Sequence, residues 1–267
     1  MSAIPQTGEN APLVVREQQD GVLRLVLNRP AARNALSMAL MAELLDAVAE
    51  AGRDPQIRVL VVAGAGPAFC AGHDLRELRA DPRRETYERV FARCSELMLE
   101  IVHLPKPVIA EVHGVATAAG CQLVATCDLA VAAADARFAT PGVNIGLFCS
   151  TPMVALSRAV GRKAAMEMLL TGELIDAATA RALGLVNRVV PPAGLRAAVD
   201  DLARRIAGKS ARTVAIGKEA FYRQAELDLA AAYRYAAEVM TTNMLAADAA
   251  EGIDAFLAKR APVWRDR

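Results

Sequence analysis

Ala68-Phe69-Cys70-Ala71-Gly72-His73-Asp74-Leu75 is the stretch of the sequence that decides the fold. It follows a short apolar run at residues 59–63, which ends at Gly64. A continuous run of this kind is typical of a buried strand in an α/β fold. Asp74 can cap a helix that begins directly after it. Strand, glycine-containing turn and capped helix together predict the α/β class.

A second glycine-flanked stretch is His113-Gly114-Val115-Ala116-Thr117-Ala118-Ala119-Gly120-Cys121-Gln122. It follows a strand predicted over residues 108–112 and leads into a helix predicted over residues 119–126. Ser37 is a plausible N-cap for an amphipathic helix that precedes both stretches. Further strands are expected at residues 13–16, 22–27, 129–132 and 185–190.

The pattern changes towards the C-terminus. Helices are predicted at residues 163–170, 176–183 and 195–207, and from residue 212 to the end. The shift from mixed α/β to helical sequence near residue 192 is the one candidate boundary. We therefore expect a core at residues 1–192 and a helical region at residues 193–267.

Composition narrows the function classes. The chain has 267 residues and a net charge of +1, which argues against a dedicated nucleic-acid binder. No apolar run approaches membrane-spanning length, so no membrane partner is expected. Five cysteines without a CxxC pair and three histidines make a metal site improbable. Free thiols suit a reducing compartment, and we expect a cytoplasmic protein.

Several motifs in order along nearly the whole chain resemble the enoyl-CoA hydratase/isomerase (crotonase) superfamily. The resemblance implies an α/β, crotonase-type spiral of ββα units with a helical C-terminal trimerisation region. It also implies a homotrimer or homohexamer and an acyl-CoA thioester ligand, with coenzyme A as part of the substrate and no separate cofactor. The motifs are Asn28-Arg29-Pro30, residues 68–75, Lys106-Pro107-Val108-Ile109-Ala110, residues 118–123, Cys127-Asp128, Leu170-Thr171-Gly172 and residues 182–186.

The same resemblance assigns roles to individual residues. The backbone N–H groups of His73 and Ala119 would form an oxyanion hole for the thioester. Ala119 starts a predicted helix, so its N–H is unpaired and lies at the positive end of the helix dipole. Residues that would bind coenzyme A are His73, Asp74, Leu75, Arg76 and Ala119, together with Phe256 and Lys259 from a C-terminal segment that often reaches a neighbouring subunit.

The acid/base positions are unusual. Hydratases of the family use two glutamates, and these map to Gln122 and Gly142. Gln can orient a water molecule but cannot accept its proton, and Gly has no side chain. The His73 ring is the best remaining base, although a ring aimed away from the pocket is an equal alternative. Restoring both glutamates is expected to raise hydratase activity.

The other polar candidates near the two stretches have structural interpretations beside their catalytic ones. Asp74 fits a helix cap, His113 a structural hydrogen bond, and Glu111 a buried carboxylate with a partner or a surface one. Cys121 and Cys149 could be nucleophiles, but neither has a histidine at a recognisable spacing.

Three functions fit this combination. The first is an acyl-CoA enzyme, nominally an enoyl-CoA hydratase/isomerase, that catalyses thioester hydrolysis, decarboxylation or slow hydration. The second is a catalytically silent acyl-CoA binding or sensing protein. The third is a scaffold subunit. Intact oxyanion segments favour the first two, and the absent carboxylates favour the second over the first.

Overall fold

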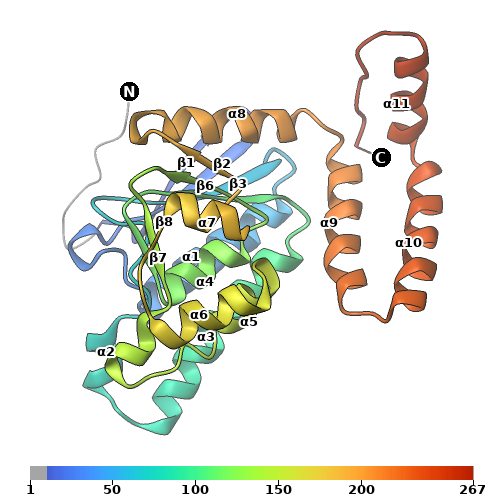
Figure 1. The fold of residues 1–267 in the computed structure, drawn as a ribbon. Coiled ribbons are helices and arrows are strands. Elements are labelled where there is room, and N and C mark those ends of the chain that lie inside the picture. The colour runs from blue at the N-terminus through green and yellow to red at the C-terminus, as the bar shows by residue number, and fades with distance from the viewer. Residues whose placement is uncertain (1–10, 267) are drawn as a thin grey trace.

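The computed structural model describes residues 11–266, and two β-sheets form its centre (Figure 1). The larger sheet has the order β1-β2-β3-β4-β6-β9, and the smaller has the order β5-β7-β8. In the larger sheet β1 is antiparallel to β2, and the remaining neighbours are parallel. The strands are β1 (Val14–Gln19), β2 (Val22–Leu27), β3 (Val59–Gly64), β4 (Val108–Val112), β5 (Val115–Thr117), β6 (Leu129–Ala133), β7 (Arg137–Ala139), β8 (Ile175–Asp176) and β9 (Arg188–Val190).

Strands of the two sheets alternate along the chain. β4 of the larger sheet is followed by β5 of the smaller sheet and then by α4 (Ala119–Thr126), and β6, β7 and α5 (Pro152–Ala159) repeat this order. The predicted α/β fold of ββα units is therefore confirmed. The strands β5, β7 and β8 were not predicted, because two or three residues are too few to show an alternating pattern.

Helices cover both faces of the larger sheet. The main core lies between one face and α1, α3 and α4, and the opposite face packs on α8 through Leu195, Val199 and Leu202. The remaining helices are α1 (Met38–Arg53), α2 (Leu75–Ala80), α3 (Arg84–His103), α6 (Arg162–Thr171), α7 (Ala177–Leu183), α8 (Leu195–Ala207), α9 (Ala211–Ala225), α10 (Leu229–Met244) and α11 (Ala247–Leu257). The division of the chain into a core and a helical region at residue 192 stays a prediction. Helix α8 follows that residue and still packs on the larger sheet.

Local signals placed several helix ends correctly. Ser37 caps α1 by accepting a hydrogen bond from the Leu40 N–H at 3.2 Å. Gly184 ends α7 in the left-handed conformation that favours glycine. Residues 212 to the end are not one continuous helix, because Asp228 caps α10 anew and Ala246 precedes α11. None of the described helices has the length and apolar composition needed to span a bilayer.

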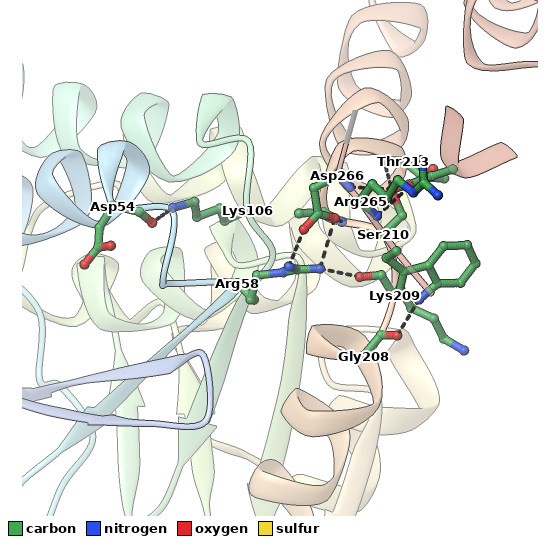
Figure 2. Close-up of polar contacts among 12 residues, drawn as sticks. Asp54, Arg58, Lys106, Gly208, Lys209, Ser210, Thr213, Arg265 and Asp266 are labelled. Atoms are coloured by element: carbon green, nitrogen blue, oxygen red, sulfur yellow. Dashed lines mark hydrogen bonds and ion pairs between the residues drawn. The ribbon is translucent and has the colours of Figure 1, made fainter. Parts of the chain in front are cut away.

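Helices α9, α10 and α11 form an arm that projects from the two-sheet body (Figure 1). Near the body, Arg58 precedes β3 and donates to Asp266 at 2.6 Å and to the Lys209 carbonyl at 2.5 Å (Figure 2). Asp266 also accepts from the N–H of Ala211, the first residue of α9. The C-terminal tail therefore returns to the base of the arm and ties it to the sheet.

A second attachment of the arm is buried. The Lys218 ammonium donates to Asp128 at 2.7 Å and to the carbonyls of Ile101 and Lys106. Tyr222, one helical turn further along α9, donates to the other Asp128 oxygen at 2.8 Å. Burial lowers the pKa of Lys218, and the Asp128 carboxylate opposes this shift. These contacts link α9 to the start of β6.

Candidate active site

The two glycine-containing turns meet beyond the ends of β3 and β4. A parallel bridge joins Cys70 to Ala116, and another joins His73 to Leu36. The Thr117 hydroxyl donates to the Ala71 carbonyl at 3.1 Å. These contacts clamp the first turn between two other segments, so its backbone is fixed before any ligand arrives.

The glycines of these turns allow a very close backbone approach. A Cβ on Gly120 would lie 2.1 Å from the Cys70 carbonyl oxygen. A Cβ on Gly72 would lie 2.9 Å from the Ala118 methyl and 3.3 Å from the Ala119 nitrogen, and Gly72 has φ +95°. The segment that carries His73 therefore lies directly against the start of α4.

Both predicted oxyanion donors are unpaired within residues 11–266. At the bridge, Leu36 donates to the Gly72 carbonyl and accepts from the Asp74 N–H, which leaves the His73 N–H directed away from Leu36. Ala119 is the first residue of α4, and no hydrogen bond from its N–H is found among the described residues. The geometry can therefore offer two amide donors, one of them at a helix N-terminus, to an oxyanion.

Ala118, between these segments, has an unusual backbone. Its φ is 50° and its ψ is −119°, and it forms the N-cap of α4 without a side-chain cap bond. Its N–H donates to the Ala139 carbonyl at 2.9 Å. A non-glycine residue in this region costs on the order of 1–3 kcal/mol, and such strain is concentrated at functional sites.

The His73 ring is buried beside the hole. Both ring nitrogens are shielded from solvent and have no hydrogen-bond partner among the described residues. The ring packs edge to face against Phe91 of α3, with centroids 5.5 Å apart. Burial lowers the pKa of the imidazole below 6.5, and the nearby Leu36 backbone opposes this shift without cancelling it. The ring is neutral at pH 7 and is a weaker base than an exposed histidine.

Gln122 lies in the first turn of α4, three residues after Ala119. Its side chain is buried, and its Oε1 lies 3.9 Å from the Cys94 thiol of α3. No protein acceptor for its amide nitrogen is found among the described residues, and this nitrogen is not closed off from solvent. It can therefore donate to a ligand or to a water molecule.

Gly142 is covered rather than open. A Cβ at this position would lie 2.5 Å from the Leu147 carbonyl oxygen and 2.9 Å from the Cys149 sulfur. The Leu147 N–H donates to the Gly142 carbonyl at 2.9 Å, so the loop is folded tightly onto this glycine. A glutamate at Gly142, which the sequence analysis expects to help raise hydratase activity, would therefore have to displace the backbone of Leu147.

The remaining polar candidates have structural partners or raised pKa values. Glu111 accepts from Arg24 at 2.7 Å in a buried ion pair that also includes Asp200. His113 Nε2 lies 2.8 Å from the Gly66 carbonyl oxygen. Burial raises the pKa of the Cys121 thiol to about 12, which makes it a poor nucleophile at neutral pH.

Comparison with known protein families shows the family to which the chain belongs. A family model described as enoyl-CoA hydratase/isomerase matches residues 17–267. The chain belongs to the enoyl-CoA hydratase/isomerase family. The family binds acyl-CoA substrates, and the two facing amide groups are consistent with that ligand class.

Curated relatives of this enoyl-CoA hydratase/isomerase family member cover most of its length. Enoyl-CoA hydratase domain-containing protein 3 of Xenopus laevis is 48% identical over 96% of this chain and 87% of its own. The human protein of that name is 48% identical over 92% of this chain and 82% of its own. These values support the resemblance drawn from the motifs.

Solved structures agree with the fold. A crystal structure of an enoyl-CoA hydratase from Mycobacterium smegmatis has a TM-score of 0.93 at 56% identity, covering 95% of this chain and 99% of its own. That of human enoyl Coenzyme A hydratase domain-containing protein 3 has a TM-score of 0.92 at 47% identity, covering 94% of this chain and 100% of its own. The crotonase-type fold is therefore shown.

The expectation of a cytoplasmic protein is wrong by the same comparison. The vertebrate relatives carry the word mitochondrial in their names. The expectation rested on free thiols, and all five cysteines are indeed unpaired. Free thiols report the redox state of a compartment and not which compartment it is.

The predicted coenzyme A residues fall into two groups. His73 and Ala119 lie at the hole, while Asp74 accepts from the N–H of Arg76 and from the Arg29 guanidinium at 2.9 Å. Desolvation raises the pKa of Asp74, but the Arg29 contact and the cap bonds outweigh it and hold this pKa below 3.8. Asp74 is therefore a helix cap. Leu75 and Arg76 are exposed beside it.

Phe256 and Lys259 do not reach the hole of their own chain. They lie at the end of α11, far from α2 and the turn before it (Figure 1). Phe256 is 82% exposed. Contact with a ligand from this position requires the site of another subunit.

Three neighbours of the site were missed in the sequence. Phe91 contacts His73, Cys94 contacts Gln122, and Leu147 covers Gly142. Phe91 and Cys94 are three residues apart and so share one face of α3. That spacing was visible, but their partners lie in other elements and no local signal points to them.

Proposed function

We propose that the protein binds acyl-CoA thioesters and polarises the thioester carbonyl between the amides of His73 and Ala119, without the two-glutamate water activation of the hydratases. The observation that carries this proposal is the pair of unpaired N–H groups on turns that the glycines hold together. Such donors act on developing negative charge without reorganisation.

The side chains favour a reaction with little acid/base demand. Gln122 can hold a water molecule but cannot take its proton. At Gly142 the Leu147 carbonyl fills the space into which a carboxylate would extend. Thioester hydrolysis, decarboxylation and slow hydration through a Gln122-held water molecule fit this set of groups.

A second candidate function is a silent acyl-CoA binding or sensing protein. The loop folded over Gly142 favours it, because an acid/base group cannot enter there. Both candidates need the same thioester complex, and they differ in turnover alone.

We also propose a homotrimer or homohexamer in which the arm contributes to the oligomer. The arm exposes Phe221, Leu229, Tyr233, Leu245 and Phe256, each with more than half of its surface open. An apolar surface of this kind is typical of an interface. Analytical ultracentrifugation should give three or six chains, and a monomer at micromolar concentration would contradict this.

The oxyanion proposal is tested by Ala119→Pro. Proline removes the N–H donor and is tolerated at the first position of a helix. Binding of butyryl-CoA, measured by calorimetry, should weaken, and any turnover should fall about 10²–10³-fold. Free coenzyme A is the matched control ligand, because it lacks the carbonyl and its affinity should not change. Equal loss for both ligands, or for neither, would contradict the role of Ala119.

Turnover is tested by incubation with several acyl-CoAs, including crotonyl-CoA, followed by mass spectrometry. We expect no rapid hydration of crotonyl-CoA. Rapid hydration that Gln122→Ala abolishes would show that the standard route is kept. The absence of any change in any thioester, with binding intact, would select the silent binder.

The change of Gln122 and Gly142 to glutamates together is not a clean gain-of-function test. A side chain at Gly142 must displace Leu147, so we expect a lower thermal midpoint and no hydratase activity. Gln122→Glu alone avoids this clash and isolates the first carboxylate.

A further inference from the structure

A cavity lies at the junction between the two-sheet body and the arm. Its volume is about 290 Å³, close to the lower limit of about 300 Å³ for small-molecule sites. Its walls come from residues 57–58 before β3, residues 105–106 before β4, the junction of α8 and α9, and Asp266 of the tail. The cavity therefore adjoins the starts of β3 and β4, whereas the oxyanion turns follow the ends of these strands.

Much of the wall is apolar. Ile57 is buried at the base of β3, and the other apolar residues are Pro105, Ile206, Val214 and Ala215. A water molecule takes up about 30 Å³ in the liquid, so the cavity has room for about ten groups of that size. An aliphatic chain of about five or six carbons fits this volume, and its transfer from water to the apolar wall is favourable.

Cations outnumber carboxylates around the cavity. The charged residues that line it are Arg58, Lys106, Lys209, Arg212 and one acid, Asp266. Lys209 and Arg212 are exposed, and no ion pair of either is found in the part of the chain that the structure describes. Burial lowers the pKa of Lys106, the charge of Asp54 opposes this shift, and the positive charge of Arg58 adds to it. An anion in the cavity would offset this excess of positive charge.

A carboxylate of the chain itself is bound at this wall. Asp266 accepts from the Arg58 guanidinium at 2.6 Å and from the Ala211 N–H at the start of α9 (Figure 2). Arg58 also donates to the Lys209 carbonyl, and its Nε–H has no acceptor among the described residues. A guanidinium has five N–H donors, so Arg58 keeps donors for a second acceptor. The Lys106 ammonium points to the Asp54 carbonyl and contributes its charge.

We propose that this cavity binds a small organic anion, a carboxylate with an aliphatic chain of about five or six carbons. The apolar wall would take the chain, and Arg58, together with the exposed Lys209 and Arg212, would take the carboxylate. The site is separate from the thioester site, and the inference does not rest on the proposed function. Because both the body and the arm line the cavity, the bound anion joins them.

The test uses the full-length protein and hexanoate as the probe, with ligand-observed NMR at constant ionic strength. Hexanol, which has the chain without the charge, should bind at least about tenfold more weakly than hexanoate. Acetate, which has the charge without most of the chain, should also bind at least about tenfold more weakly. Saturating butyryl-CoA should leave hexanoate bound. Displacement would place hexanoate in the thioester site and overturn the inference.

Two matched variants locate the anion. Arg212→Gln and Arg204→Gln each remove one exposed positive charge, but Arg212 lines the cavity and Arg204 does not. Arg212→Gln should weaken hexanoate binding about threefold, and Arg204→Gln should leave it unchanged. Ala215→Leu places a larger side chain at the cavity wall and should weaken binding at least about tenfold. Circular dichroism checks that each variant folds.

Several outcomes would overturn the inference. One is the absence of hexanoate binding to the wild type at about 10 mM. Another is equal binding by Arg212→Gln and Arg204→Gln, or full binding by folded Ala215→Leu, since the anion would then lie elsewhere. None of these results depends on whether a thioester binds or turns over, so each leaves the proposed function standing. The pair of arginine variants decides the location even where Ala215→Leu does not fold.

Discussion

The two glycine-containing turns of the proposed oxyanion hole and the C-terminal arm are held in place in different ways. In the turns, backbone packs on backbone, and Gly72 and Gly120 leave no space for a methyl group. The arm is tied to the body by a buried contact at Lys218 and a more exposed one at Asp266, and its apolar side chains are open. The turns are complete within one chain, whereas the arm has an unpartnered surface. Substitutions should therefore act by steric exclusion in the first region and by loss of polar contacts in the second.

The largest effect is expected from Gly120→Ala. Its Cβ would lie 2.1 Å from the Cys70 carbonyl oxygen, which belongs to backbone that bridges fix on both sides. We expect a loss of about 4 kcal/mol or more in the free energy of unfolding, in the exceptional range for single substitutions. Urea denaturation followed by circular dichroism measures it. A loss below about 1 kcal/mol would show that the turns can separate and that the hole is not rigid.

The next largest effect is expected from Lys218→Met. It removes the cation that joins Asp128 to the carbonyls of Ile101 and Lys106, and it leaves the carboxylate with fewer partners in a partly buried position. Breaking a buried pair from one side costs about 3–5 kcal/mol.

The same variant tests what the arm does. If the arm completes an oligomer, ultracentrifugation of Lys218→Met should show smaller species before the body unfolds. Lys209→Met is the control, because Lys209 is exposed and its hydrogen bonds among the described residues come from its backbone and not from its ammonium group. An unchanged oligomer with reduced stability would show that the buried contact supports the body alone.

The sequence predicts features that depend on neighbouring residues better than features that depend on contacts between distant segments. The caps at Ser37 and Asp74 and the bounds of α4 follow from local signals, and the structure has them where the sequence placed them. The contact of Phe91 with His73 and the cover of Leu147 over Gly142 join distant segments. Such contacts depend on how loops pack, which no local pattern encodes.

A smaller and opposite effect is expected from Ala118→Gly. Glycine adopts φ 50° and ψ −119° without the cost that alanine has there, although it loses more chain entropy on folding. We expect a gain of about 1 kcal/mol in the free energy of unfolding. The control is Gly217→Ala in α9, where no atom lies within 4 Å of the new Cβ. It should also stabilise, by about 0.5–1 kcal/mol through helix propensity.

Each of these two variants has an outcome that would change the contrast between the glycine-containing turns and the arm. Destabilisation by Ala118→Gly would mean that packing of the Ala118 methyl group, which faces Gly72, stabilises the protein by more than the strained backbone of Ala118 destabilises it. Destabilisation by Gly217→Ala would mean that a partner chain covers this exposed face of α9. The first outcome concerns a region complete within the chain, and the second shows that the arm is completed from outside.

The smallest effect is a change in stability with pH, and the pH range in which it occurs differs between the two regions. In the arm, the Arg260 contact lowers the pKa of Glu251 to about 2 from 4.5, so this stabilising contact is lost only as the pH falls between these values. In the body, burial lowers the pKa of His73 below 6.5. The unfolded chain then binds a proton at a pH where the folded chain does not, so stability falls as the pH drops below 6.5, until the folded pKa is reached.

Unfolding in urea at pH 7.5 and pH 5.5 measures this difference. The wild type should lose more stability between the two values than His73→Gln, which has no titratable ring at this position. His103→Gln is the matched control, because it removes an imidazole from an exposed position of α3 outside the site. Equal pH dependence in wild type and His73→Gln would mean that the ring reaches water in solution. In that case the contrast between a closed site and an open arm would be lost at this residue.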